Sequence, residues 1–395
     1  MKAGNLLREK EELTLQRSPG TLSYLAAVVL LAMYFSCAQP VHSEELSETG
    51  AFFITADAAV LMDARTGQIL YEKNARQKRP PASTTKIMTA LLALEGGDLQ
   101  QIVTVSPNAA STGEASLDLR PGEKLTLEEL IYGAMLESGN DACVAIAEHI
   151  SGTEENFVLL MNQKAKMIGA EDTSFKNSNG LPAAGHCTTA RDLAVITRYA
   201  LRNDIFRKVV STRGRAVGGE KCRYLSNTNR LLWSYAWADG VKTGTTGEAG
   251  NCLVASATKD GRQLISVVLH SDDRWLDSVK LMEFGFENFN LVQAVGRGEP
   301  IARVTVKEGT EKEVKAVAGA GIDAVVPKNG RERPEKAVEI KKDVIAPVQK
   351  GQYLGRVTIL VKGEVIGSAD LVADRSVERE NALRVFLKKA GGYFK

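Results

Sequence analysis

Three short segments of this 395-residue chain combine residue types that can do chemistry together, and the first is residues 83–86, Ser-Thr-Thr-Lys. On a helix, positions i and i+3 share a face about 5–6 Å apart, so the Lys86 amine can reach the Ser83 hydroxyl. A serine hydroxyl becomes a nucleophile when a base takes its proton, and a lysine can be that base when burial lowers its pKa. The segment therefore predicts a nucleophile and its base, although Ser-x-x-Lys alone is common by chance.

The second segment is Ser138-Gly139-Asn140, which lies between two helical patterns. A loop at this place can direct a hydroxyl and an amide into a cleft. Taken alone, the same residues are far more typical of a helix cap and turn than of a catalytic loop.

The third segment is Lys242-Thr243-Gly244-Thr245, which opens a strand pattern. On an edge strand, the free backbone groups can pair with an extended peptide. Lys242 would bring charge and Thr243 a hydroxyl, while Gly244 would leave room for close approach. We expect the backbone N–H of Thr245 to act with that of Ser83 as an oxyanion hole.

The patterns around these segments predict an α+β domain over residues 51–290, with strands at both ends and helices between them. Pro80-Pro81 and Gly96-Gly97 bound an apolar stretch, as proline and glycine bound a helix, and its all-round apolar character predicts that this helix is buried. Hairpins are expected over residues 58–71 and around Asp260-Gly261. Further helical patterns cover 127–136, 141–150, 154–168, 189–201 and 281–289, and strand patterns cover 241–245, 253–258 and 264–270.

Residues 291–375 predict a small all-β sandwich domain, because short alternating stretches are separated by Gly, Pro and charged residues. These stretches are residues 301–306, 314–317, 357–361 and 365–371. In the last segment, residues 376–395, apolar and basic residues are spaced as in an amphipathic helix that lies on a membrane surface. An ordinary C-terminal helix would have the same spacing.

The first 43 residues predict a secretory signal peptide, because a basic segment precedes the uncharged run 22–38 and small residues follow it. Cleavage is expected after Ala38 or Ser43. The uncharged run is also close to the ~18–20 residues that span a bilayer, so an uncleaved anchor is the alternative. We therefore expect an exported protein of the cell envelope, attached to the outer face of the cytoplasmic membrane.

Composition and cysteine spacing exclude several classes. Lys+Arg 50 against Asp+Glu 48 leaves a formal charge of +2, which argues against a protein that coats nucleic acid. Four cysteines follow the signal segment, at positions 143, 187, 222 and 252, and none has the CxxC spacing of a zinc site. Cys143 and Cys252 stand among apolar residues, so we expect buried free thiols there.

Taken together, the three segments match in order and spacing the S-x-x-K, S-x-N and K-T-G set of penicillin-binding proteins and β-lactamases. Their surroundings resemble the low-molecular-mass penicillin-binding D-alanyl-D-alanine carboxypeptidases, a peptidase S11-like family, over nearly the whole mature chain. The resemblance implies a β-lactamase/transpeptidase-like domain, an antiparallel sheet with a helical cluster, followed by a β-rich second domain. The matching stretches are residues 81–89 (PASTTKIMT), 137–142 (ESGNDA), 179–182 (NGLP), 186–192 (HCTTARD), 239–244 (DGVKTG) and the ending from Arg274 to Phe286.

The resemblance also implies a mechanism. Ser83 would attack the carbonyl between the two D-alanines of a peptidoglycan stem pentapeptide and form an acyl-enzyme, with Lys86 as the base. Ser138 would bridge Lys86 and Lys242 and relay a proton to the leaving D-alanine. Water would then hydrolyse the ester, and penicillins would acylate Ser83 as substrate mimics.

The substrate contacts are implied in the same way. Asn140 would hold the peptide amide of the substrate, Lys242 and Thr243 would meet its terminal carboxylate, and Arg274 would add a second cation. No metal or organic cofactor is implied. Thr245 stands where some relatives have His or Phe, so the pH optimum and turnover cannot be copied from them.

Other functions remain to be compared with this one. A DD-endopeptidase that cuts peptidoglycan crosslinks would use the same residues, although such relatives usually lack the second domain. A non-catalytic wall-binding scaffold is disfavoured by the intact site residues. A class A β-lactamase needs a Glu-x-x-Leu-Asn segment that residues 171–180 do not supply. Ser-His-Asp hydrolysis lacks Gly-x-Ser-x-Gly around Ser138, and zinc hydrolysis lacks His-Glu-x-x-His.

Overall fold

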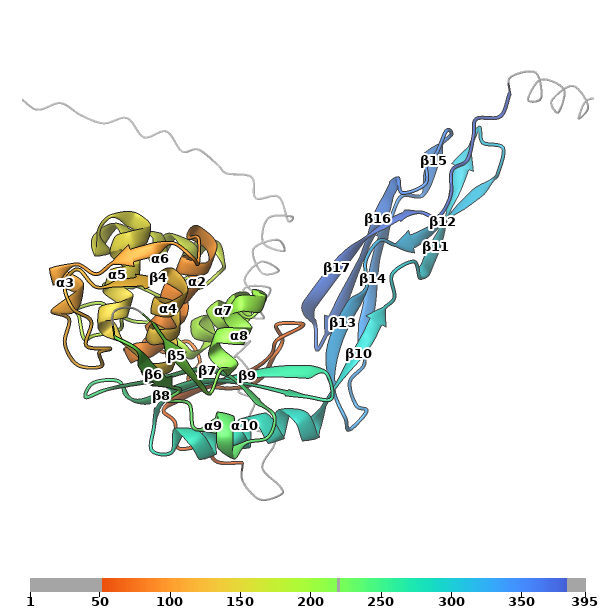
Figure 1. The fold of residues 1–395 in the computed structure, drawn as a ribbon. Coiled ribbons are helices and arrows are strands. Elements are labelled where there is room, and N and C mark those ends of the chain that lie inside the picture. The colour runs from red at the N-terminus through yellow and green to blue at the C-terminus, as the bar shows by residue number, and fades with distance from the viewer. Residues whose placement is uncertain (1–51, 219–220, 382–395) are drawn as a thin grey trace, which may run out of the picture. The chain divides into compact units, whose positions relative to one another are not determined.

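The computed structural model describes residues 52–218 and 221–381 (Figure 1). The predicted signal peptide, residues 1–43, lies outside the described residues. So do residues 382–395, most of the segment for which an amphipathic helix is predicted.

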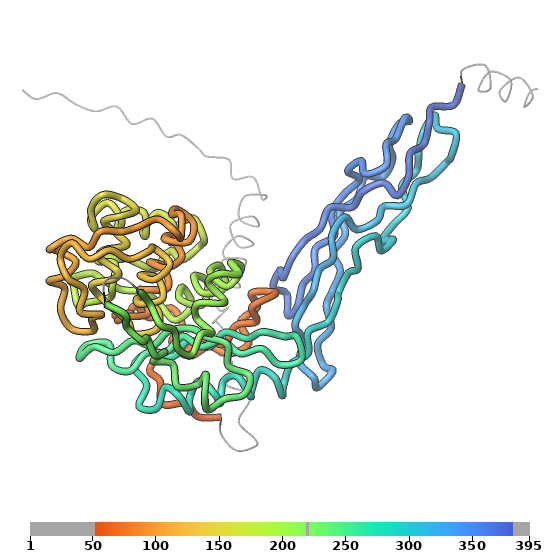
Figure 2. Tube along the Cα trace, viewed as in Figure 1, coloured from red at the N-terminus to blue at the C-terminus, as the bar shows by residue number. Residues whose placement is uncertain are grey.

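A five-stranded antiparallel sheet, in the order β2-β1-β9-β8-β7, forms the centre of the first domain. Strands that are far apart in the sequence meet in it: β1 of the predicted first hairpin pairs with β9, the last strand of the sheet in the sequence (Figure 2). Strand β7 is at the sheet edge, as the sequence predicted for the Lys-Thr-Gly segment. The strands are β1 (Ala58–Asp63), β2 (Ile69–Lys73), β7 (Ala238–Thr246), β8 (Gly250–Lys259) and β9 (Arg262–Ser271).

Both faces of this sheet are covered, and strand β1 shows how. Its residues are buried throughout, and successive side chains point to opposite faces. Ala58, Val60 and Met62 belong to the core shared with the helical cluster, whereas Ala59 and Leu61 belong to the core under the last helix. Helices α7 (Ala190–Ala200) and α8 (Asp204–Ser211) pack on the first face, and α9 (Leu231–Ser234) and α10 (Arg274–Asn288) lie on the second (Figure 1).

The helical cluster lies between β2 and β7 in the sequence, and its helices begin at recognisable caps. Thr126 and Glu129 form a capping box, while Thr153 and Thr189 cap the helices that follow them. The predicted helix over 127–136 is interrupted, because a π-helical turn replaces its second half. The elements are η1 (Ala82–Thr85), α2 (Lys86–Gly96), α3 (Pro107–Ala110), α4 (Leu127–Tyr132), η2 (Gly133–Glu137), α5 (Asn140–Ser151) and α6 (Glu154–Met167), with the small sheets β3 (Ile102–Thr104)–β4 (Lys124–Thr126) and β5 (Gly214–Val217)–β6 (Arg223–Ser226).

The second domain is all-β, as predicted, and its core consists mainly of valine, alanine, leucine and isoleucine. Residues 376–381 are extended, and Val377 and Arg379 form bridges with Val348 and Gly309, so they belong to this domain. Its strands are β10 (Phe289–Val295), β11 (Pro300–Lys307), β12 (Glu313–Ala318), β13 (Ile322–Pro327), β14 (Glu335–Ile340), β15 (Asp343–Ile345), β16 (Tyr353–Val361) and β17 (Glu364–Ala373), in sheets ordered β10-β13 and β14-β16-β17-β12-β11-β15.

The cysteines after the signal segment are free, and Cys143 and Cys252 are buried, as predicted, whereas Cys187 is partly exposed and Cys222 is exposed. Among the helices in the described part of the chain, none is long and apolar enough to cross a membrane.

Candidate active site

Ser83 lies in η1, at the N-terminal end of the buried helix α2. The residue before it, Ala82, has φ +48°, a left-handed conformation that costs about 1–2 kcal/mol for an L-residue. Backbone strain of this kind persists where the surrounding structure holds it in place, and it is concentrated at functional sites. Here the holding contact is Gly180, whose backbone lies against the Ala82 carbonyl.

Lys86 points back along the helix to Ser83, at the i+3 spacing that the sequence predicted. Its Nζ lies 2.9 Å from Ser83 Oγ and donates to Asn140 Oδ1 and to the Asn179 carbonyl oxygen, each at 2.7 Å. The side chain is fully buried, and this burial lowers the pKa of Lys86 to about 8. A neutral amine has two N–H groups and one lone pair. The Asn140 and Asn179 oxygens occupy the two donors, so the lone pair is left to accept the Ser83 proton.

This pKa predicts how the reaction depends on pH. Only roughly one-tenth of Lys86 is neutral at pH 7, so kcat/KM should rise nearly tenfold per pH unit below pH 7 and level off above about 8. The measurement is D-alanine release from a D-Ala-D-Ala peptide between pH 5.5 and 9.5. Burial lowers the pKa of His186 to about 4, so His186 stays neutral over this range. A profile that is flat between pH 6 and 8 would contradict Lys86 as the base.

Asn140 contacts Lys86, and Ser138 stands two residues before it in the chain. Ser138 ends the π-helical turn in a left-handed conformation with φ 65°, and Asn140 begins α5. The side-chain oxygen of Asn140 accepts a hydrogen bond from Lys86, and its side-chain N–H donates to the Gly113 carbonyl at 2.9 Å. Among the residues that the structure describes, the Ser138 hydroxyl bridges neither Lys86 nor Lys242, so the proton relay remains a prediction.

Strand β7 approaches the nucleophile through Gly244. A Cβ added there would lie 3.1 Å from the backbone nitrogen of Ser83, the Pro81 oxygen and the Ala82 Cβ. Strand β7 and η1 therefore lie in close contact at this glycine, and the close approach of a substrate peptide there stays a prediction. The contact places the peptide bond between Gly244 and Thr245 next to Ser83, where the two N–H groups of the expected oxyanion hole belong.

Lys242 is also buried, 1% exposed, and its Nζ donates to the Thr243 carbonyl at 3.1 Å. Burial, together with the nearby charge of Lys86, lowers the pKa of Lys242 well below its usual value. The two neighbouring amines compete for a proton, because two positive charges repel each other. Lys86 has three oxygen neighbours and Lys242 has one, so the proton is held more strongly by Lys86. An incoming carboxylate would favour protonation of Lys242.

Arg274, at the start of α10, reaches across the sheet to the same edge. Its Nη1 donates to the Gly244 carbonyl at 2.9 Å and to Thr245 Oγ1 at 2.8 Å. The guanidinium is thereby fixed beside the strand that a substrate would pair with. The Thr243 hydroxyl lies 2.8 Å from that of Thr228. Eight of the nine residues that the sequence proposed for the site are thus joined by these contacts or lie on the same edge of β7. Ser138 stands two residues before Asn140, and within the described residues its hydroxyl forms no hydrogen bond with them.

Sequence reasoning missed the loop that covers α2, residues 177–181. Its carbonyl groups at Ser178 and Asn179 accept hydrogen bonds from Thr89 and Lys86, at 2.5 and 2.7 Å. These are backbone acceptors, which side-chain types do not reveal; the available signal was the Asn179-Gly180 pair. Asp141 was not predicted to have a role either. Its carboxylate accepts hydrogen bonds from the backbone N–H groups of Leu117 and Leu119. These bonds hold the loop that contacts Asn140.

Comparison with known proteins now adds to this geometry. Residues 44–273 match the family model of D-alanyl-D-alanine carboxypeptidases. The chain belongs to this family. Residues 286–379 match the C-terminal domain of penicillin-binding protein 5. This span agrees with the observed β domain, which begins at Phe289 and includes Arg379.

Relatives in the family cover most of the chain. The D-alanyl-D-alanine carboxypeptidase DacF of Bacillus subtilis is 38% identical, over 85% of this chain and 89% of its own length. DacC of Escherichia coli is 35% identical, over 82% and 85%. Among solved structures, penicillin-binding protein 5 of Haemophilus influenzae is 33% identical with a TM-score of 0.73, over 84% of this chain and 100% of its own. The predicted fold class, α+β followed by a β domain, is confirmed.

Proposed function

We propose that this chain is a serine-type D-Ala-D-Ala carboxypeptidase that removes the terminal D-alanine from peptidoglycan stem pentapeptides and is acylated by penicillins. One observation carries the proposal: a buried lysine amine lies 2.9 Å from the hydroxyl of Ser83, and two carbonyl oxygens fix its other donors. Family membership supplies the substrate class, because the relatives are named for this activity.

The first half of the reaction forms the acyl-enzyme. Ser83 Oγ attacks the carbonyl carbon between the two D-alanines as its proton passes to Lys86 Nζ. The negative charge on the carbonyl oxygen is stabilised by the backbone N–H groups of Ser83 and Thr245. The C–N bond then breaks, and the leaving amine of D-alanine receives a proton from Lys86, through Ser138 if that hydroxyl turns toward it.

The terminal carboxylate of the substrate binds near Lys242, Thr243 and Arg274. Burial of Lys242 lowers its pKa, so an arriving anion restores its charge and gains an ion pair shielded from water. Arg274 adds a cation that is always protonated. This arrangement favours a peptide that ends at the D-alanine over one that continues.

The second half releases the product. A water oxygen attacks the ester carbonyl and gives up one proton to Lys86, which is again neutral after the first half. The bond to Ser83 Oγ breaks, and Ser83 recovers its proton. The peptide leaves one D-alanine shorter with a new C-terminal carboxylate, and the second proton of the water passes to solvent.

The test compares the full chain with Ser83→Ala in D-alanine release from a D-Ala-D-Ala-terminated pentapeptide, followed by mass spectrometry. The wild type should shorten the peptide by one D-alanine, and the variant should lose at least about 10³-fold in rate, as removal of a catalytic nucleophile does. A folded wild type that leaves the pentapeptide intact would contradict the proposal. Cleavage of a crosslinked dimer in that case would favour the endopeptidase instead.

We further propose that catalysis takes place outside the cytoplasm, with export by residues 1–43. Attachment to the membrane surface is proposed for the segment after residue 381, because residues 376–381 belong to the β domain. Stem peptides of the cell wall are presented in that compartment, and the family acts on the wall. The check is the N-terminus of the exported chain, which should begin after residue 38 or 43; an N-terminus at Met1 would contradict cleavage.

A further inference from the structure

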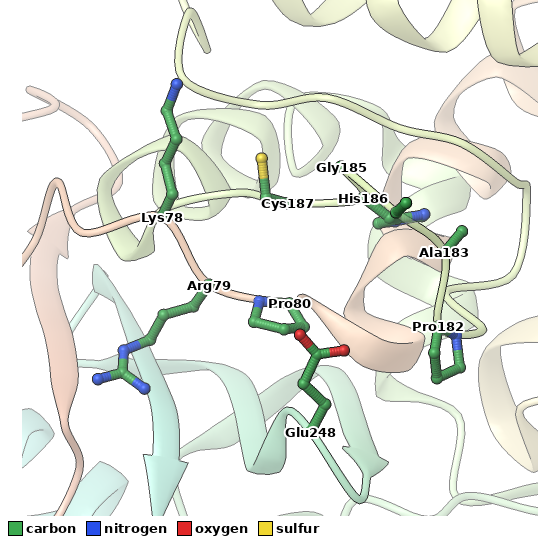
Figure 3. A pocket seen from close by; sticks show the side chains of 10 residues that line it. Lys78, Arg79, Pro80, Pro182, Ala183, Gly185, His186, Cys187 and Glu248 are labelled. Carbon is green, nitrogen blue, oxygen red and sulfur yellow. The ribbon is translucent and has the colours of Figure 1, made fainter.

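A cavity of about 460 Å³ opens beside the candidate active site (Figure 3). One wall is Pro80, three residues before the nucleophile, and the opposite wall is the loop that follows Gly180. Glu248, in the connection between β7 and β8, forms a third side. The lining residues are Lys78, Arg79, Pro80, Pro182, Ala183, Ala184, Gly185, His186, Cys187 and Glu248.

The cavity shares part of its lining, including Pro80, Pro182 and Glu248, with a second hollow that lies nearer to Ser83 in the chain. This smaller hollow is also lined by Pro81, Gly180 and Thr246, among others. A Cβ added to Gly180 would lie 3.0 Å from the backbone nitrogen of Ser83. A group bound in the cavity would therefore lie near the loop at Gly180, which contacts the backbone of Ser83.

The direction of strand β7 shows which part of a substrate would reach this cavity. The substrate's terminal carboxylate is assigned to Lys242 and Thr243, before the Gly244–Thr245 peptide at which the reacting carbonyl is placed. A peptide pairing antiparallel with β7 then continues upstream past Thr246, toward Glu248. Each extended residue advances about 3.3 Å, so a long side chain on the residue before the two D-alanines can enter the cavity.

Among the charged side chains that line the cavity, some form ion pairs with other residues of the protein and one does not. Lys78 is paired with Asp172 at 3.4 Å, and Arg79 with Asp57 at 3.0 Å. Glu248 has no ion pair or hydrogen bond within residues 52–218 and 221–381, and its carboxylate points toward Pro80 across the cavity (Figure 3). The free charge at the cavity is thus negative, and it stands on the connection that directly follows β7.

We propose that this cavity is an upstream subsite for a cationic side chain, an ammonium group on the substrate residue that precedes the two D-alanines, with Glu248 as its counter-charge. The inference rests on the proposed function for the identity of the peptide. Pro80 and Pro182 form walls with little conformational freedom, so the pocket is preformed.

The test uses two peptides that differ in one charge: Nα-acetyl-L-Lys-D-Ala-D-Ala with a free ε-amine, and the same peptide with this amine acetylated. The wild type should favour the charged peptide by about two- to fivefold in kcat/KM, the range of a solvent-accessible ion pair. Glu248→Gln should bring the ratio to about one. Glu155→Gln, which removes an exposed carboxylate on α6 that does not line the cavity, should retain the wild-type ratio.

The ratio is read in two ways, so that failure of the proposed function is distinguishable from failure of the subsite. The first readout is D-alanine release, and the second is competition of each peptide against acylation of Ser83 by benzylpenicillin. If neither peptide is trimmed but the charged one competes better in the wild type and not in Glu248→Gln, the subsite stands and the carboxypeptidase proposal fails. Equal handling of the two peptides by the wild type, or an unchanged preference in Glu248→Gln, overturns the subsite.

Discussion

Replacing Lys86 with methionine is expected to slow acylation of Ser83 by about 10²–10⁴-fold, the range supplied by a positioned general base. Methionine keeps most of the length of the buried side chain and removes the amine that lies 2.9 Å from Ser83 Oγ. Without it, the serine proton has no acceptor of suitable pKa, and the Asn140 and Asn179 oxygens lose their shared donor. The measurement is the rate of penicilloyl-enzyme formation, followed by intact-protein mass spectrometry at a fixed benzylpenicillin concentration.

Lys164→Met provides the matched control for this variant. Lys164 is also a buried lysine on a helix, α6, and its Nζ lies 2.6 Å from a carboxylate oxygen of Glu95 on α2. Its loss should reduce the free energy of unfolding, because it leaves a partly buried carboxylate without its partner. Acylation per folded molecule should stay close to the wild-type rate. Acylation of Lys86→Met within threefold of the wild type would show that another group takes the proton.

Gly180→Ala is expected to destabilise the active site because the added methyl group would clash with the backbone beside Ser83. Gly180 has φ +93°, and a Cβ there would lie 1.9 Å from the Ala82 carbonyl oxygen. The left-handed conformation costs about 1–2 kcal/mol, and relieving a clash of this kind adds about 1–3 kcal/mol. Because the Ala82 carbonyl cannot move without moving Ser83, acylation should fall as well, by at least tenfold as an order-of-magnitude estimate.

Gly152→Ala separates the two contributions to this loss. Gly152 has φ +81° at the end of α5, with no atom within 4 Å of the added Cβ. It should therefore show the conformational cost alone and keep the wild-type acylation rate. Urea unfolding of both variants gives the difference in free energy. If Gly180→Ala were as stable and as active as Gly152→Ala, the contact between Gly180 and Ala82 would not support the nucleophile.

The parts of the fold that the sequence predicted are those with a strong local signal. The hairpin over residues 58–71 and the buried helix after Pro81 follow from turn residues and apolar spacing, which act within one element. Helix α8 and the small sheet β5–β6 were missed, because short elements of this kind are stabilised by packing against β7 and η2 rather than by their own periodicity. The π-helical turn before Ser138 was missed for the same reason.

In the candidate site, too, some features could be predicted from the sequence and others could not. The residues of the three segments were proposed because their types and order form a known set, and Arg274 was added from the wider resemblance. The spacing between Ser83 and Lys86 fixes the geometry of that pair on a helix. The support for Lys86 comes partly from the carbonyl oxygen of Asn179, and every residue has such an oxygen, so no residue type marks it. The Glu248 cavity was also invisible, because Pro80, the loop after Gly180 and the β7–β8 connection meet only in the folded chain.

The most direct test of the account is to locate the acyl group. The full chain and Ser83→Ala are incubated with benzylpenicillin, digested with protease and analysed by peptide mass spectrometry. The account predicts a penicilloyl adduct on the peptide that contains Ser83 and no adduct in the variant. An adduct on a peptide that contains Ser138 or another residue, or an adduct that persists in Ser83→Ala, would contradict the assignment of Ser83 as the nucleophile.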